Sequence, residues 1–196
     1  PENPEKIFYV GITCGLSAPY IAGQLDTLRP NEKSTNVLMG FNPRETARNV
    51  EIEGWTKTFE QVLAECEETE NFHLLNPIYG PESIMGSTRM KGGSVTKILL
   101  ESIFFAAHEL AGINTQAEGA LTTDDIGEPA KIADRIKSFF KQYAQTVQAT
   151  YDHIDAISEL VRHGGSTLRC GGRIAYLGRE SAGIVGLIDA SECPPT

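Results

Sequence analysis

Residues 7–40 read IFYVGITCGLSAPYIAGQLDTLRPNEKSTNVLMG, and this stretch decides the expected fold. Its first and last parts, Ile7–Ile12 and residues 36–40, are short apolar runs of the kind that forms strands. Between them, Pro19–Leu28 carries apolar residues at helical spacing. A strand, a helix and a second strand in this order predict two parallel strands joined by a helical crossover.

The same alternation continues along the chain. Residues 55–68 predict a helix with one apolar stripe, formed by Trp55, Phe59, Val62, Leu63 and Cys66. Phe72–Leu75 then predicts a third strand. The fold class expected is therefore α/β, with a parallel sheet covered by helices on both faces in three layers.

The second half of the sequence is mostly helical. The elements expected there are, in chain order, a helix from Gly93, a polar connector over residues 111–128, a helix from Pro129, a helix over residues 154–161, a stop at Gly171 and Gly172, a fourth strand over residues 173–178, and a helix over residues 183–190.

Composition and charge exclude several classes of protein. The chain has 196 residues, is 40% apolar and 22% charged, and carries a formal charge of −9, which argues against non-specific nucleic-acid binding. No apolar run reaches the roughly 18 residues of a membrane helix, so no membrane partner is expected. The four cysteines lack a C-x-x-C motif and metal spacing, which predicts reduced thiols in a cytoplasmic or nuclear protein with no metal and no cofactor. Because the chain begins Pro1-Glu2-Asn3-Pro4 without a Met, we expect it to be a piece of a longer protein.

The first candidate site is the turn that follows the first strand. It contains Thr13, Cys14, Gly15 and Ser17, and Pro19 opens the next helix. Hydroxyl groups together with the free N–H groups of a helix N-terminus can bind a phosphate, and a glycine lets the backbone approach it closely. The alternative interpretation is an ordinary turn in which Ser17 caps the helix.

The second candidate site is the loop that precedes the helix expected from Gly93. Ser87 and Thr88 offer hydroxyls there, and Arg89 and Lys91 offer cations that could pair with a phosphate or with Glu82. Both loops follow strands of a parallel sheet, so we expect them at the same sheet edge, where such sheets bind ligands. The alternative is a solvated loop whose Ser94 caps the helix.

Five segments of the sequence resemble the glucokinase regulatory protein family. They are residues 10–26, 40–43, 47–49, 75–82 and 86–101, the last reading GSTRMKGGSVTKILLE. The motif GPE followed by GSTRMKGG is specific, although a related family, N-acetylmuramic acid 6-phosphate etherase, shares it. Both families are built on sugar isomerase (SIS) domains, three-layer α/β/α units that are flavodoxin-like and bind phosphorylated sugars.

The resemblance implies a function as well as a fold. It implies a regulator that binds fructose 6-phosphate or fructose 1-phosphate and inhibits a glucokinase-type hexokinase, with glucokinase as the candidate partner and no catalysis of its own. Laid along the family, residues 1–110 correspond to the latter part of a first SIS domain, 111–165 to a helical connector, and 166–196 to the opening of a second. Thr13, Cys14 and Gly15 match only part of the family's sugar-phosphate pocket. Residues 26–36 match a region of glucokinase contact but are more polar here, so inhibition through that same contact is not expected.

Two alternatives remain open at this point. The first is an N-acetylmuramic acid 6-phosphate etherase or another SIS enzyme, in which Glu192 would be catalytic. Elimination needs a positioned acid and base, and residues 181–184 lack the serine and arginine of the etherase phosphate loop. Enzymatic turnover is therefore not expected. The second alternative is a fragment with only a scaffold role.

Overall fold

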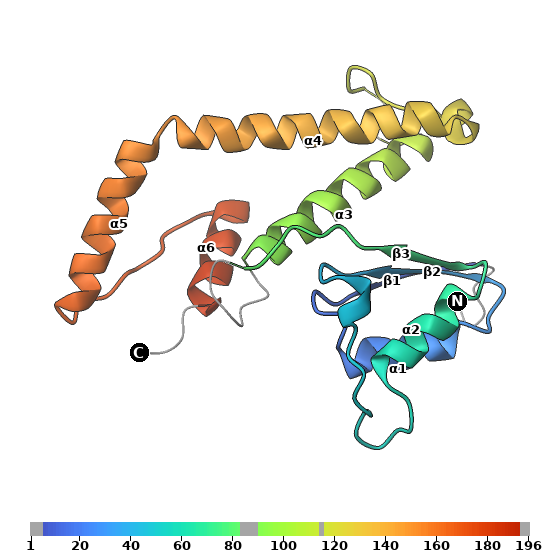
Figure 1. The fold of residues 1–196 in the computed structure, drawn as a ribbon. Coiled ribbons are helices and arrows are strands. Elements are labelled where there is room, and N and C mark those ends of the chain that lie inside the picture. Colours follow the sequence, from blue (N-terminus) through green and yellow to red (C-terminus); the bar gives the residue numbers. More distant parts are fainter. Residues whose placement is uncertain (1–5, 83–89, 114–115, 193–196) are drawn as a thin grey trace. The chain divides into compact units, whose positions relative to one another are not determined.

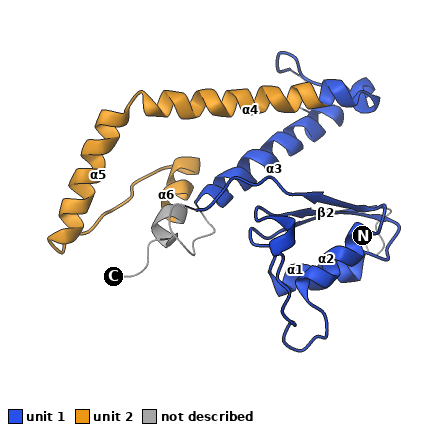
Figure 2. Cartoon of the chain, viewed as in Figure 1, with its two compact units in different colours: residues 1–132 blue, residues 133–196 orange. Residues whose placement is uncertain are grey.

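The computed structural model describes residues 6–82, 90–113 and 116–192, with side chains described as far as residue 187. By its internal contacts the chain divides into two units, residues 1–132 and 133–196, and each is described by itself (Figure 2). The division does not test the expected domain boundaries at residues 110 and 165, which stay a prediction.

A parallel sheet forms the centre of the first unit. Its strands are β1 (Ile7–Ile12), β2 (Ser34–Met39) and β3 (Phe72–Leu75), in the order β1-β2-β3 (Figure 1). Both pairings are parallel, and β2 begins two residues earlier than expected because Ser34 is already paired with Ile7. The predicted α/β class is confirmed.

Two helices cover one face of this sheet. They are α1 (Pro19–Leu28) and α2 (Phe59–Glu67) (Figure 1). The second helix was expected from residue 55 but starts at Phe59, because the Thr58 hydroxyl accepts the Gln61 N–H at 3.1 Å and the Gln61 side chain accepts the Thr58 N–H at 3.0 Å. This capping box sets the first helical residue, and Trp55 packs on the core from the preceding loop.

The hydrophobic core lies between α1, α2 and the helix-covered face of the sheet. Its buried members are Leu16, Ala22, Leu25, Leu38, Ala47, Phe59, Val62, Leu63, Cys66 and Phe72. On the opposite face of the sheet, Phe8, Thr35 and His73 are exposed. Alternate residues of a strand point to opposite faces, and both faces carry apolar residues, such as Leu38 on the helix-covered face and Val37 on the other.

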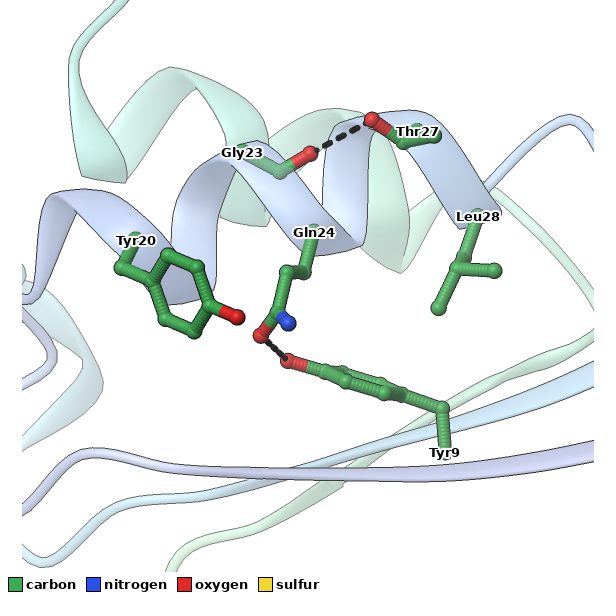
Figure 3. A pocket seen from close by; sticks show the side chains of 6 residues that line it. All are labelled: Tyr9, Tyr20, Gly23, Gln24, Thr27 and Leu28. Carbon is green, nitrogen blue, oxygen red and sulfur yellow. Dashed lines mark hydrogen bonds between the residues drawn. The ribbon is translucent and has the colours of Figure 1, made fainter.

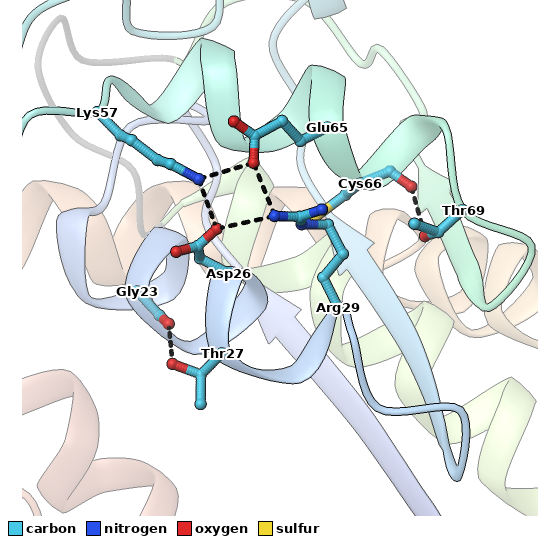
Figure 4. Close-up of polar contacts among 8 residues, drawn as sticks. All are labelled: Gly23, Asp26, Thr27, Arg29, Lys57, Glu65, Cys66 and Thr69. Atoms are coloured by element: carbon cyan, nitrogen blue, oxygen red, sulfur yellow. Dashed lines mark hydrogen bonds and ion pairs between the residues drawn. The ribbon is translucent and has the colours of Figure 1, made fainter.

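An ion-pair network joins α1 to α2 on the outside of the core. The Asp26 carboxylate contacts Arg29 at 3.4 Å and Lys57 at 2.9 Å, and Glu65 contacts the same two cations at 2.9 and 2.7 Å (Figure 4). A second tie connects the short 3₁₀ helix η1 (Arg44–Thr46) to α2, where Arg44 donates to both oxygens of Glu67. These contacts fix the two helices at their polar edges.

The remaining elements of the first unit lead to the long helices. Helix α3 (Lys91–Leu110) is followed by a connector that contains the 3₁₀ helix η2 (Thr123–Gly127). The buried carboxylate of Glu109 accepts the Leu121 N–H at 3.0 Å and so ties the connector to α3. Helix α4 (Pro129–Tyr151) starts at Pro129, as predicted from the position of that proline.

The second unit is helical in its described part. It holds most of α4 and the helices α5 (Ile154–Arg169) and α6 (Glu180–Glu192), and Gly171, with φ of 74°, follows the end of α5 as expected. Residues 173–178 were expected to be a strand and are not one. A strand needs a hydrogen-bonded neighbour, and in the described part of this unit no other strand exists. No helix of the described residues is long and apolar enough to cross a membrane.

Candidate functional site

The first candidate site is a turn between β1 and α1, as predicted. The Thr13 N–H donates to the Met39 carbonyl at 2.9 Å, so the turn begins where β1 leaves the ladder with β2. The Leu16 N–H donates to the Thr13 carbonyl at 3.1 Å, and the Ser17 N–H donates to the Thr13 hydroxyl at 3.4 Å. Helix α1 is capped by Ala18 without a side-chain hydrogen bond, so the alternative in which Ser17 caps it is wrong.

The loops after all three strands are hydrogen-bonded to one another. The Cys14 carbonyl accepts the N–H groups of Phe41 and Asn42, at 2.9 and 3.1 Å. The Asn76 side chain, just after β3, donates to the carbonyls of Gly40 and Asn42, at 2.8 and 2.9 Å. These bonds hold the turn at Cys14 in a fixed position at the carboxyl edge of the sheet.

Glu82 connects the loop after β3 to the start of α3. Its carboxylate accepts the N–H groups of Lys91 and Gly92, each at 2.7 Å, and the Tyr79 hydroxyl at 2.9 Å. The expected tie between Lys91 and Glu82 therefore exists, but through the Lys91 backbone; its ammonium group lies 5.4 Å from the centre of the Tyr79 ring. Ser94 is inside the helix and donates to the Met90 carbonyl, so it does not cap α3.

The start of α3 lies beside the turn after β1. A Cβ atom added to Gly92 would be 3.1 Å from Cys14 Sγ and 2.7 Å from Tyr79 Oη. Only a glycine allows so close an approach. The described part of the second candidate loop is thus at the same sheet edge as the first, as expected.

The electrostatics of the edge follow from these contacts. Desolvation opposes the charge of Glu82, but the hydrogen bonds from Gly92, Lys91 and Tyr79 hold its pKa below the ordinary value. Desolvation, followed by the bond to Glu82, raises the pKa of Tyr79 to about 12. Desolvation and the nearby Glu82 charge raise the pKa of the Cys14 thiol. At neutral pH the edge therefore presents a carboxylate, a phenol and an un-ionised thiol.

Some predicted site residues lie outside the described part of the chain. Ser87, Thr88 and Arg89 fall there, as does the side chain of Glu192. The roles of all the candidate residues in ligand binding stay predictions. Sequence reasoning did not single out Asn42, Asn76 or Tyr79, although Asn76 directly follows a strand, which is the position where ligand-edge residues occur. Among the described residues, no group of three or more His, Cys, Asp or Glu could hold a metal.

A separate pocket lies between β1 and α1. It is lined by Tyr9, Tyr20, Gly23, Gln24, Thr27 and Leu28 (Figure 3). The Tyr9 hydroxyl donates to the Gln24 side-chain oxygen at 2.8 Å across its floor. None of these residues belongs to the loops at the carboxyl edge of the sheet.

Comparison with known proteins shows which proteins this chain is similar to. The family described as "Glucokinase regulatory protein N-terminal SIS domain" matches residues 2–29, which include β1, the turn and α1. A glucokinase regulatory protein of Xenopus laevis is 38% identical over the whole chain, and that of Homo sapiens is 36% identical over 96% of it. The expected resemblance to the glucokinase regulatory protein family is confirmed. The chain spans 30% of the length of the Xenopus regulatory protein and 29% of the human one.

The expected resemblance of this chain to N-acetylmuramic acid 6-phosphate etherases is also confirmed. An N-acetylmuramic acid 6-phosphate etherase of Klebsiella aerogenes is 44% identical over 26% of this chain and 17% of its own length. One from Mycolicibacterium smegmatis is 36% identical over 45% of this chain and 29% of its own length. The similarity to the regulatory proteins covers almost the entire chain, and the similarity to these etherases covers less than half of it.

Proposed function

We propose that this chain belongs to a non-catalytic regulator that binds a sugar phosphate and inhibits a glucokinase-type hexokinase. The observation that carries the proposal is the close approach of the turn after β1 to the start of α3. A Cβ atom added to Gly92 would be 3.1 Å from Cys14 Sγ. Two loops with anion-binding groups then form one site at the sheet edge. The likeness to glucokinase regulatory proteins along almost the whole chain supports the regulatory role.

The ligand proposed is a hexose phosphate, with fructose 6-phosphate and fructose 1-phosphate as the candidates. The turn supplies the Ser17 hydroxyl, and Gly15 carries no side chain that would keep a phosphate away. Pro19, the first residue of α1, has no N–H, and the Ile21 N–H donates to the Ala18 carbonyl, so the Tyr20 N–H is the donor that the start of α1 offers to an anion. The Lys91 ammonium group adds a cation on the α3 side. Thr13 is buried, and its hydroxyl accepts from Ser17, so it acts by shaping the turn.

The chemistry of the described residues supports binding over catalysis. A general base needs a pKa near the working pH, whereas the pKa of Glu82 is lowered and its oxygens accept three hydrogen bonds. The Cys14 thiol, whose pKa is raised, is a weak nucleophile at neutral pH. The etherase alternative depends on Glu192, and steady release of lactate from N-acetylmuramic acid 6-phosphate would favour it, provided that Glu192→Gln abolishes the release.

Calorimetric titration of the 196-residue chain with fructose 6-phosphate tests the proposal. We expect binding that weakens about tenfold or more in Lys91→Met, because a charge-assisted contact to phosphate is lost. Lys33→Met is the matched control, since Lys33 is exposed at the opposite end of the sheet, just before β2. The absence of any binding by the unaltered chain would contradict the proposed ligand. A glucokinase activity assay with and without fructose 6-phosphate tests the partner.

A further inference from the structure

The N-terminus of α3 is already occupied by an anion of the protein itself. The first N–H groups of a helix lack partners in the helix and attract anions such as phosphate. Here the Lys91 N–H donates to one oxygen of Glu82, and the Gly92 N–H donates to the other. The helix end that would bind a ligand phosphate instead holds a carboxylate.

This carboxylate is part of the proposed site. The position of a Cβ atom on Gly92 would be 3.1 Å from Glu82 Oε1 and also 3.1 Å from Cys14 Sγ, so the carboxylate and the turn after β1 flank the same backbone atom. The Tyr79 hydroxyl and the two N–H groups stabilise the negative charge of Glu82. A ligand whose phosphate lies in the turn therefore reaches toward a fixed negative charge.

We propose that Glu82 makes the site selective for sugar monophosphates over sugar bisphosphates. The phosphate lies at the turn before α1, and the uncharged hydroxyls of the sugar lie toward Glu82, whose Oε2 accepts one hydrogen bond and keeps a second lone pair to accept from a hydroxyl. A second phosphate at that end would face the carboxylate with the α3 N–H groups already engaged and with the Lys91 ammonium group already paired with the first phosphate, and like charges in such a position oppose binding. This inference rests on the proposed function.

The test compares fructose 6-phosphate with fructose 1,6-bisphosphate in titrations of the 196-residue chain. We expect the monophosphate to bind about tenfold more tightly. Glu82→Gln removes the charge while keeping the size of the side chain, so the preference should fall to about twofold or less. Glu68→Gln, an exposed glutamate at the end of α2, changes the net charge equally and should keep the full preference.

The possible outcomes distinguish a failure of this inference from a failure of the proposed function. Binding of neither ligand removes the proposed function and the inference with it. Two outcomes overturn the inference alone. One is equal binding of both ligands by the unaltered chain. The other is a preference that stays unchanged in Glu82→Gln, even where both ligands bind more weakly. A measurement without any variant provides a second check: raising the salt concentration screens charge repulsion, so the preference of the unaltered chain should shrink, and a salt-independent preference would contradict the role of Glu82.

Discussion

The two units of the chain use similar apolar patterns with different results. In the first unit, the apolar sides of α1 and α2 meet the sheet, and side chains such as Leu25 and Phe59 are almost completely buried. In the second unit, α5 also carries an apolar stripe, yet Leu160 is 73% exposed and Val161 68%. No side chain described in residues 133–187 is buried. In the described part of this chain, apolar stripes make a core in the unit where strand crossovers return the chain upon itself, and helical periodicity alone does not provide one.

The largest expected effect comes from removing the central aromatic side chain of the first unit. Phe59 is 1% exposed, so Phe59→Ala should lower the free energy of unfolding by about 3–5 kcal/mol. The fluorescence of Trp55, the one tryptophan of the chain, reports on this unit because Trp55 packs on its core. Denaturant titrations followed by this signal would measure the loss.

The matched substitution in the second unit is Phe140→Ala. Phe140 is 38% exposed on α4, and its removal should cost about 1 kcal/mol or less. A loss as large as that of Phe59→Ala would show that the second unit has a core of its own, and the comparison between the units would then be wrong.

Two glycines give the next effect and sharpen the comparison. A Cβ atom at Gly40 would lie 2.2 Å from Leu16 Cδ2, so Gly40→Ala should destabilise the first unit by about 1–3 kcal/mol through overpacking. Gly165, inside α5, has no atom within 4 Å of an added Cβ, and Gly165→Ala should stabilise that helix by about 0.5–1 kcal/mol. Circular dichroism during thermal unfolding would show the two opposite shifts; shifts of the same sign would contradict the packing described.

A smaller effect is expected from the ion-pair network between α1 and α2. Its side chains are about one-quarter to one-third exposed, and solvent weakens such pairs. Lys57→Met, which removes two of the contacts, should therefore cost only about 0.5–1 kcal/mol. The loss should shrink at high salt in the same denaturant titration, whereas a salt-independent loss would mean that Lys57 acts through packing against Trp55.

The smallest effect concerns Asp125, near the boundary between the units. Hydrogen bonds from Lys131, from the Thr122 N–H and from the Thr122 hydroxyl lower its pKa from 3.8 to about 2. Because the folded pKa is the lower one, its stabilising contribution is complete above about pH 4 and is lost as the pH falls toward 2. Nuclear magnetic resonance should show the Thr122 amide signal shifting over this range. The shift should disappear in Asp125→Asn, and a transition centred near pH 4 would contradict the assigned contacts.

The first unit could be predicted closely because its signals are local. Three elements have the bounds expected from apolar periodicity and from a proline at a helix start, namely Ile7–Ile12, Pro19–Leu28 and Phe72–Leu75. The parallel order of strands followed from the alternation of strands and helices. The shared sheet edge of the two candidate loops followed in turn from that order.

Two of the three failures occurred where the outcome depends on distant partners, and one occurred at a local helix start. Residues 173–178 have the composition of a strand, but composition supplies no neighbouring strand. The capping box of Thr58, which excluded Trp55 from α2, was visible in the sequence and was outweighed by the apolar stripe. The two oxygens of Glu82 bind N–H groups nine and ten residues away, and no periodic pattern indicates which partner a loop carboxylate selects.

The close packing of Leu16 against Gly40 has a consequence for how this protein can evolve. Leu16 is fully buried in a left-handed conformation with φ of 49°, and its side chain fills the space that a larger residue at position 40 would need. Shortening Leu16 first opens that space and leaves the Thr13 carbonyl oxygen, 3.2 Å from the added Cβ, as the near contact of Gly40→Ala, whereas the reverse order passes through a clash with Leu16. The two positions are therefore epistatic, and the effects of substituting them do not add.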